Sequence, residues 1–194
     1  DFDFENNEDC EYNENESALY FNGQDTYVTG EIQGSLFSGD WTIQSVFYHM
    51  QPDHSQWSTI LSFCTYSGCS DTPVFDFIPD DMESRRIGMN RIGQDGSGVY
   101  LDLGSDHFEK WIFASIRKSG NTITIDAYVD GEWLSHSEQW SWGGFNSSFD
   151  NYYIGRHHYN DMSMFHGFID KVQVFDYALS NDDIRQYVED GHIQ

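Results

Sequence analysis

Two segments of the chain combine aromatic and polar side chains in a way that suits the recognition of a sugar. One reads HSEQWSWGGF over residues 136–145, where Trp140 and Trp142 alternate before two glycines, and the other reads RHHYNDMSMF over residues 156–165. Flat aromatic faces pack against the C–H groups of a sugar, and a few polar side chains bind its hydroxyls. We therefore expect a binding pocket that includes Trp142, Arg156, His158, Tyr159 and Asp161.

A structural role is an open alternative for each of these residues. Trp140 is a candidate for the protein core rather than for a binding surface. His157 and His158 are neighbours, and neighbouring side chains of a strand point to opposite faces of a sheet. The two imidazoles are therefore poorly placed to bind one metal ion together.

Catalysis has little support in the sequence. The chain has no E-x-D-x-x-E run, the pattern in which a retaining glycoside hydrolase on a β-sandwich would hold two acids close together. It also lacks G-x-S-x-G, H-E-x-x-H and a phosphate-binding Gly-Lys loop. We expect no catalysis. A polysaccharide lyase or hydrolase is kept as an alternative, because a site built from separate strands leaves no local motif.

The charge of the chain argues against two classes of partner. Its 33 acidic residues outnumber its 9 lysines and arginines, which gives a formal net charge of −24. Nucleic acids and anionic membranes would be repelled, and we expect neither as a partner. The acidic surface suits solubility, a salt-rich source, or the binding of Ca²⁺, which prefers several oxygen ligands from carboxylates and carbonyls. We expect one structural Ca²⁺ ion.

The cysteines indicate an oxidising compartment. Cys64 and Cys69 enclose TYSG, and this spacing suits a small disulfide loop. Cys10 is left over, and the sequence does not assign it a partner. No stretch approaches the ~20 apolar residues of a membrane span, and the chain begins without methionine or a signal peptide. We therefore expect a mature product or an excised domain that is secreted or displayed at the cell surface.

Short alternating runs between turn signals predict an all-β domain of two stacked antiparallel sheets. Asp130 and Gly131 read as a tight hairpin turn, and residues 119–121 as another. Residues 1–17 hold eight acids and no base, so we expect a leader that is disordered or strapped across a domain of residues 18–194. Strands are expected at residues 18–21, 26–28, 41–49, 59–65, 74–78, 87–90, 99–103, 111–117, 122–129, 132–135, 151–154 and 167–175.

The run Phe165 to Tyr187 predicts a strand, a turn and a capped helix. Ser180 stands where an N-cap belongs, with Asp183 three residues later, and Ile184 begins a helical spacing that continues with Tyr187 and Val188. In the strand, alternation predicts one face made of Phe168, Val172 and Val174, and an opposite face made of Ile169, Lys171 and Gln173.

Four segments, taken in order, carry a resemblance to a known family. They are ALYFNGQDTYV at 18–28, residues 37–47 ending in WTIQSVF, KWIFASIRKSGNTITIDAYVDG at 110–131, and the closing run at 165–187. In these segments the chain resembles the laminin G-like, concanavalin A-like jelly-roll domains, with Trp41 in place of the usual phenylalanine. The resemblance implies a two-sheet antiparallel β-sandwich of jelly-roll type with a short C-terminal helix.

The resemblance also implies a position for the metal ion. In such jelly rolls the first and last strands lie side by side, and many relatives hold one structural Ca²⁺ there. It implies Asp25 and Asp170 as ligands, with a backbone carbonyl from Gly23 or Asn22. The alternative is that Asp25 is a turn residue and that Asp170 is an exposed partner of Lys171.

The function implied by the resemblance is that of a non-catalytic, extracellular carbohydrate-binding or adhesion module, a lectin-like domain of a larger surface protein. Its expected partners are a glycan or a glycosylated surface and other domains of the same protein. The fold alone does not fix the function, since one sandwich serves many roles. A protein-interaction or structural module of an adhesin or fibre, and a polysaccharide-degrading enzyme, are the alternatives.

Overall fold

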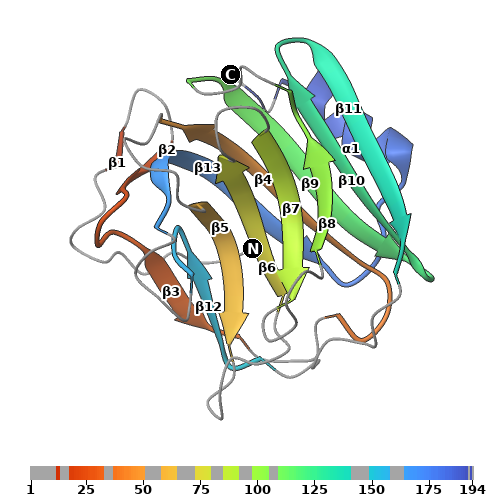
Figure 1. The fold of residues 1–194 in the computed structure, drawn as a ribbon, viewed down its shortest axis with the longest axis horizontal. Coiled ribbons are helices and arrows are strands. Elements are labelled where there is room, and N and C mark those ends of the chain that lie inside the picture. The colour runs from red at the N-terminus through yellow and green to blue at the C-terminus, as the bar shows by residue number, and fades with distance from the viewer. Residues whose placement is uncertain are drawn as a thin grey trace.

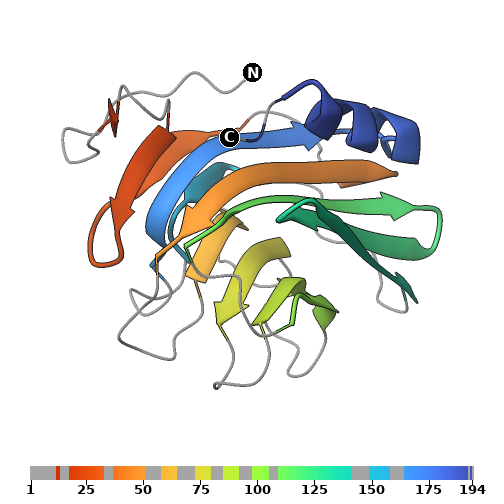
Figure 2. The same cartoon turned by 90° about the horizontal axis from the view of Figure 1, so that it is seen from above.

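In the residues that the structure describes, two antiparallel β-sheets are stacked face to face and one helix lies on the outside of the larger sheet (Figure 1). Seen from above, the two sheets form separate layers, and the helix lies on the side of the larger sheet that faces away from the smaller one (Figure 2). The structure is a computed structural model. It describes residues 12–13, 18–32, 37–50, 58–64, 73–79, 85–91, 98–104, 109–140, 149–157, 164–191 and 193.

The larger sheet has seven strands in the order β1-β2-β13-β4-β9-β10-β11. All neighbouring strands pair antiparallel. The opening strand β2 lies beside the closing strand β13, as the resemblance implies, and β1, inside the expected leader, pairs with β2. The strands are β1 (Tyr12–Asn13), β2 (Ala18–Asn22), β4 (Trp41–His49), β9 (Trp111–Ser119), β10 (Thr122–Val129), β11 (Glu132–Gln139) and β13 (His166–Phe175).

The smaller sheet has six strands in the order β3-β12-β5-β6-β7-β8. The strand expected at residues 26–28 begins at Val28, because the preceding residues form a turn around the Asn22 side chain. The side-chain oxygen Oδ1 of Asn22 accepts hydrogen bonds from the backbone N–H groups of Gln24, Asp25 and Thr26. The strands are β3 (Val28–Glu31), β5 (Ser58–Cys64), β6 (Pro73–Pro79), β7 (Arg85–Arg91), β8 (Gly98–Asp102) and β12 (Asn151–Ile154).

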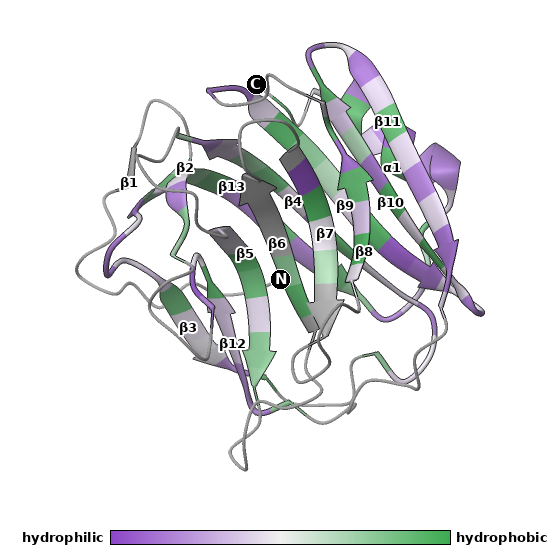
Figure 3. Ribbon diagram, in the orientation of Figure 1, coloured by the Kyte–Doolittle hydropathy of each residue, from purple (hydrophilic) through white to green (hydrophobic). Residues whose placement is uncertain are grey.

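The core lies between the two sheets and follows the period-2 pattern of the sequence. In β10, Ile123, Ile125, Ala127 and Val129 are buried, while the residues between them are partly exposed. Trp140 is buried in the same core, so its structural role is confirmed. Hydrophilic residues predominate along β11, which forms an edge of the larger sheet and is mostly exposed (Figure 3).

The predicted faces of the closing strand are correct downstream, where Val172 and Val174 face the core, but wrong for Phe168 and Ile169. Ile169 and Val172 point into the core and Val174 packs against it, whereas Phe168 lies on the opposite face. The reason is a β-bulge: the pairing with β4 shifts by one residue between Ile169 and Lys171. An extra residue in one strand reverses the alternation beyond it, and this change of face cannot be read from a two-residue period.

The helix α1 (Asn181–Glu189) has the predicted start. The Ser180 side chain accepts the Asp183 N–H, and the Asp183 carboxylate accepts the Ser180 N–H and O–H, which together form a capping box. These hydrogen bonds to Ser180 lower the pKa of Asp183. Ile184 is buried against Val46 and Phe113 of the larger sheet. No helix in the described part of the chain has the length and apolarity that a membrane span requires.

Candidate functional site

Four aromatic side chains form a continuous row across the larger sheet. Phe168 of β13 pairs with Tyr20 of β2 on one side and with Tyr48 of β4 on the other, and Tyr48 pairs with Trp111 of β9. We call Tyr20, Phe168, Tyr48 and Trp111 the aromatic row. Neighbouring strands lie about 4.8 Å apart, so the row extends about 14 Å across the strands.

The rings of the aromatic row are in contact with one another. The ring centroids of Tyr20 and Phe168 are 5.2 Å apart, those of Phe168 and Tyr48 6.1 Å, and those of Tyr48 and Trp111 5.6 Å. The interplanar angles of these pairs lie between 48° and 65°. Tilted pairs at such distances are favourable, so each ring holds its neighbour in place.

The aromatic row lies on the outer face of the sheet. The residues next to it in the chain, such as Phe21, Phe47 and Ile169, are buried in the core between the sheets. Because side chains alternate along a strand, the row points away from that core. Its four side chains are partly exposed rather than buried. The glycine before Phe168 is required for this arrangement, since a Cβ on Gly167 would lie 2.0 Å from the Tyr48 carbonyl oxygen.

A pocket of about 460 Å³ lies at the Trp111 end of the row. This volume is within the range of small-molecule sites. We call it the aromatic pocket, because Tyr48, Trp111 and Tyr128 supply three rings to its wall. The remaining lining residues are Glu109, Lys110, Asp130, Gly131, Val188 and Ile193.

Both acids of the aromatic pocket have unusual backbone conformations. Glu109 has φ 57° and Asp130 has φ 52°, values that residues other than glycine seldom adopt. Asp130 and Gly131, with φ 82°, form the predicted hairpin turn, in which both central residues need positive φ. The Glu109 N–H donates to the His49 carbonyl at 3.0 Å. Each carboxylate therefore extends from a fixed backbone.

The chemistry of the aromatic pocket suits a polyhydroxylated ligand. The three rings offer apolar faces, and the carboxylates of Glu109 and Asp130 accept hydrogen bonds from hydroxyl groups. Lys110 forms an ion pair with Asp130 and adds a donor beside it. This is the combination of apolar walls and a few polar groups by which ligand pockets obtain specificity.

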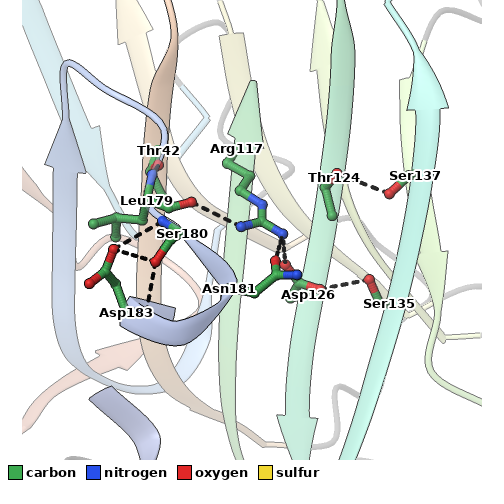
Figure 4. A network of polar contacts seen from close by, with 10 residues as sticks. All are labelled: Thr42, Arg117, Thr124, Asp126, Ser135, Ser137, Leu179, Ser180, Asn181 and Asp183. Carbon is green, nitrogen blue, oxygen red and sulfur yellow. Dashed lines mark hydrogen bonds and ion pairs between the residues drawn. The ribbon is translucent and has the colours of Figure 1, made fainter. Parts of the chain in front are cut away.

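A second hollow, of about 370 Å³, lies between the strands β9 to β11 and the start of α1 (Figure 4). In this polar groove the Arg117 guanidinium donates to the Leu179 carbonyl at 2.9 Å and to Asn181, and lies 3.3 Å from Asp126. Asp126 also accepts a bond from Ser135 at 2.6 Å. The polar groups of the groove thus bind one another and attach α1 to the sheet.

Of the five residues predicted to bind a sugar, Arg156 is the one that the structure describes. It follows β12, and its guanidinium lies 4.7 Å from the centre of the Tyr27 ring, while its carbonyl accepts the Ser62 hydroxyl at 2.9 Å. This position is on the smaller sheet, apart from the aromatic row. Burial lowers the pKa of the neighbouring His157 to about 4. Trp142, His158, Tyr159 and Asp161 lie outside the described residues, and their binding role stays a prediction.

The structure does not bring the predicted calcium ligands together. Asn22 is the register partner of His166, which precedes Asp170 by four residues, or about 13 Å of strand. Gly23 and Asp25 follow Asn22 in the turn, and the Asp25 carboxylate accepts a bond from the Asn22 amide at 2.6 Å. Within the described residues no three His, Cys, Asp or Glu side chains are grouped to hold a metal ion. A shared ion between Asp25 and Asp170 does not fit this geometry.

Of the two cysteines of the predicted disulfide, the structure describes Cys64. Cys64 is the last residue of β5, is buried and is disulfide-bonded. Cys10 and Cys69 lie outside the described residues. The pairing of Cys64 with Cys69 therefore stays a prediction.

The aromatic row was missed in the sequence because its members come from four distant segments that only strand register brings together. A usable signal was nevertheless present in two strands. Tyr20 precedes the buried Phe21, and Tyr48 follows the buried Phe47. By alternation, one aromatic residue of each pair must face away from the core. Large aromatic side chains on the outer face of a sheet are candidates for binding.

Comparison with known proteins agrees with the fold. The family model described as concanavalin A-like lectin/glucanases superfamily, Laminin_G_3, matches residues 22–185. A comparison with curated proteins finds no match.

Three solved structures illustrate the likeness. A pentraxin of Limulus polyphemus superposes with a TM-score of 0.67 at 15% identity, over 88% of this chain and 80% of that one. The CBM40 domain of a Ruminococcus gnavus sialidase, bound to α2,3 sialyllactose, superposes with a TM-score of 0.54 at 16% identity, over 80% of this chain and 94% of that one. Botulinum neurotoxin type C is described as dependent on two ganglioside molecules for cell entry. It superposes with a TM-score of 0.66 at 11% identity, over 94% of this chain and 44% of that one.

At these identities the solved structures support the fold alone. The family model covers most of the chain, from the end of β2 through the closing strand to the first turn of α1. The chain therefore belongs to the concanavalin A-like lectin/glucanase superfamily, as a laminin G-like domain.

Proposed function

We propose that this chain is a non-catalytic carbohydrate-binding module and that it binds a glycan in the aromatic pocket and along the aromatic row. The observation that carries the proposal is the grouping of Tyr48, Trp111 and Tyr128 with two carboxylates in one pocket of about 460 Å³. The rings provide the apolar faces that a sugar needs, and the carboxylates accept its hydroxyl protons.

In this arrangement a sugar ring packs on the indole of Trp111. Its hydroxyl groups donate to the Glu109 and Asp130 carboxylates, and Lys110 donates to a sugar oxygen. The ion pair with Lys110 already holds the Asp130 side chain, so less conformational entropy is lost when its carboxylate binds a hydroxyl. Two of the similar proteins are described with a sialylated sugar or a ganglioside, which supports a glycan as the class of ligand.

The proposal includes a position outside the cell, as part of a surface protein that adheres to glycans. Membership of the laminin G-like family supports this location. Catalysis is not part of the proposal. Incubation of the protein with neutral and anionic polysaccharides should yield no shortened or unsaturated product, and the appearance of either product favours an enzyme.

Calcium binding is a separate prediction, because the described geometry does not unite Asp25 with Asp170. If the turn at Gly23 and Asp25 binds Ca²⁺, added Ca²⁺ raises the melting temperature, since a ligand of the native state stabilises it. Asp25→Asn should then abolish the rise, and Asp170→Asn should preserve it. A melting temperature that is insensitive to Ca²⁺ and to chelator, at fixed ionic strength, removes the ion from the proposal.

The decisive experiment for the proposal is a glycan array followed by calorimetry with two tryptophan variants. Trp111→Ala should weaken binding about thirtyfold, the effect of losing a central contact of about 2 kcal/mol. Trp133→Ala is the matched control: it lies on the same face of the same sheet and lines the polar groove, and it reaches the aromatic pocket through the contact of its ring with Tyr128. Its glycan affinity should stay near that of the parent protein.

The same experiment separates the aromatic pocket from the loop predicted in the sequence. If Trp142→Ala or Tyr159→Ala abolishes binding while Trp111→Ala leaves it unchanged, the glycan binds at the loop. If no glycan on the array binds, the protein-interaction or structural module becomes the better description of the chain.

A further inference from the structure

We infer that the aromatic pocket and row bind an uncharged, linear oligosaccharide of several sugar units and discriminate against glycans that carry carboxylates. This inference rests on the proposed function and adds the class of glycan. It does not follow from the similar proteins, since the two that are described with sugars take a sialylated sugar and a ganglioside.

The charge of the pocket favours an uncharged ligand. Its described lining holds the carboxylates of Glu109 and Asp130 and the ammonium group of Lys110. Lys110 forms its ion pair with Asp130, so the charges of these two side chains balance each other. The carboxylate of Glu109 then adds an excess of negative charge to the pocket. A carboxylate on the ligand would approach this excess charge at short range, where like charges repel most strongly.

The whole chain adds to the repulsion. Its formal net charge of −24 creates a negative potential that lowers the local concentration of anionic ligands. This contribution is long-ranged and weakens as salt shortens the Debye length, to about 8 Å at physiological ionic strength. The local contribution of Glu109 is screened less. The two contributions can therefore be separated by varying the salt concentration.

The shape of the surface favours a chain rather than a single sugar. The aromatic row continues from the pocket through Tyr48 and Phe168 to Tyr20, about 14 Å across the sheet. At its far end the Tyr20 hydroxyl lies 3.4 Å from Nε2 of His166, so two hydrogen-bonding groups lie beside the last ring. A ligand that follows the row meets an aromatic face on each of four neighbouring strands.

The experiment compares glycans that differ only in charge or only in length. Sialyllactose is paired with its methyl ester, and oligogalacturonate with its methyl ester, each titrated at low and at physiological salt. Neutral oligosaccharides of two to six units form the length series. We expect the neutral member of each pair to bind about tenfold or more tightly, and affinity to increase with length.

Two charge variants locate the source of the discrimination. Glu109→Gln should reduce the preference for the neutral glycan several-fold, at both salt concentrations. Glu31→Gln removes the same charge from an exposed position on β3 of the smaller sheet and should leave the preference unchanged. Tyr20→Ala should lower the affinity for the longest oligosaccharides and leave that for disaccharides unaltered.

The outcomes distinguish this inference from the proposed function. Equal or tighter binding of the anionic partner, lost in Trp111→Ala, overturns the inference and leaves the proposed function in place. Affinity that does not depend on length, with Tyr20→Ala indistinguishable from the parent, overturns the linear-chain part. Binding of none of these glycans overturns both proposals together.

Discussion

The aromatic pocket and the polar groove lie on the same face of the same sheet, near opposite ends of α1, yet they are built differently. Their volumes are similar, about 460 and 370 Å³, so size does not distinguish them. In the groove, Arg117 binds Leu179, Asn181 and Asp126, and its polar groups are used within the protein. In the pocket, aromatic faces and carboxylates line the space itself.

This difference teaches how a structural hollow is told from a binding surface. Polar side chains that satisfy one another gain nothing when a ligand displaces them, because each new hydrogen bond replaces an existing one. Aromatic faces on the outside of a sheet gain when a ligand removes them from water. The groove is therefore expected to control stability and the pocket to control binding.

The largest expected effect tests the groove. The side chains of Arg117 and Asp126 are only 13% and 14% exposed, and Arg117→Ala leaves the Asp126 carboxylate without its cation. We expect a loss of about 3 kcal/mol in the free energy of unfolding, measured by urea denaturation. Glycan affinity of the folded variant should not change.

Arg185→Ala is the matched control for this variant. Its guanidinium lines the same groove and lies 5.0 Å from the centre of the Trp133 ring, on the exposed side of α1. The loss should stay near 1 kcal/mol or below. If Arg117→Ala keeps its stability and loses glycan binding, the two regions have been assigned the wrong way round.

The next effect tests the pocket through Tyr48, which belongs to both the pocket and the row. Tyr48→Ala should weaken glycan binding about tenfold, because it removes a ring face from each. Tyr153→Ala, an aromatic on β12 of the smaller sheet in contact with Tyr27, serves as the control. An equal loss of glycan affinity in calorimetric titrations of the two variants would mean that the effect is not specific to the larger sheet.

A smaller effect tests whether the two ends of α1 act separately. Ser180→Ala removes the capping box at the groove end and should cost about 1 kcal/mol of stability, seen in thermal or urea unfolding. Val188 and Ile193, at the other end, line the pocket. Glycan affinity should therefore remain within about twofold of the parent value; a larger loss would show that the helix couples the two regions.

The last expected effect appears only at high pH. Burial, assisted by the negative charge of Asp170, raises the pKa of Tyr187 to about 12. The folded state thus holds the phenol proton more tightly than the unfolded state, whose ordinary value is about 10. The resulting stabilisation is complete below pH 10 and is lost as the pH rises through 12. Tyr187→Phe should remove this loss, measured as the difference between the two unfolding curves over that range.

Much of the fold could be predicted, because local patterns decide it. Alternation located the strands, the Asp130–Gly131 pair located a hairpin turn, and Ser180 with Asp183 located the start of α1. Each of these signals lies within a few residues of the feature it produces. Even the neighbouring position of β2 and β13 followed from the family resemblance.

The candidate site could not be predicted in the same way. Alternation groups Phe168 with Val172 and Val174, because the bulge after Ile169 leaves no signal in a two-residue period. Asp25 and Asp170 were paired from a resemblance that gives the order of strands but not their register. The partners of Tyr48 on either side lie 63 and 120 positions further along the chain, and only three-dimensional pairing selects them.

The bulge in β13 makes the pairing of one residue, rather than the type of any side chain, a determinant of the outer surface. If Asp170 paired regularly with Phe47 while β13 kept its pairing downstream, Phe168 would turn toward the interior and Ile169 and Gly167 would turn outward, which would interrupt the line of rings at its second member. One extra residue in a strand is thus a means of placing a ring on the outer surface of a sheet without any change of residue type.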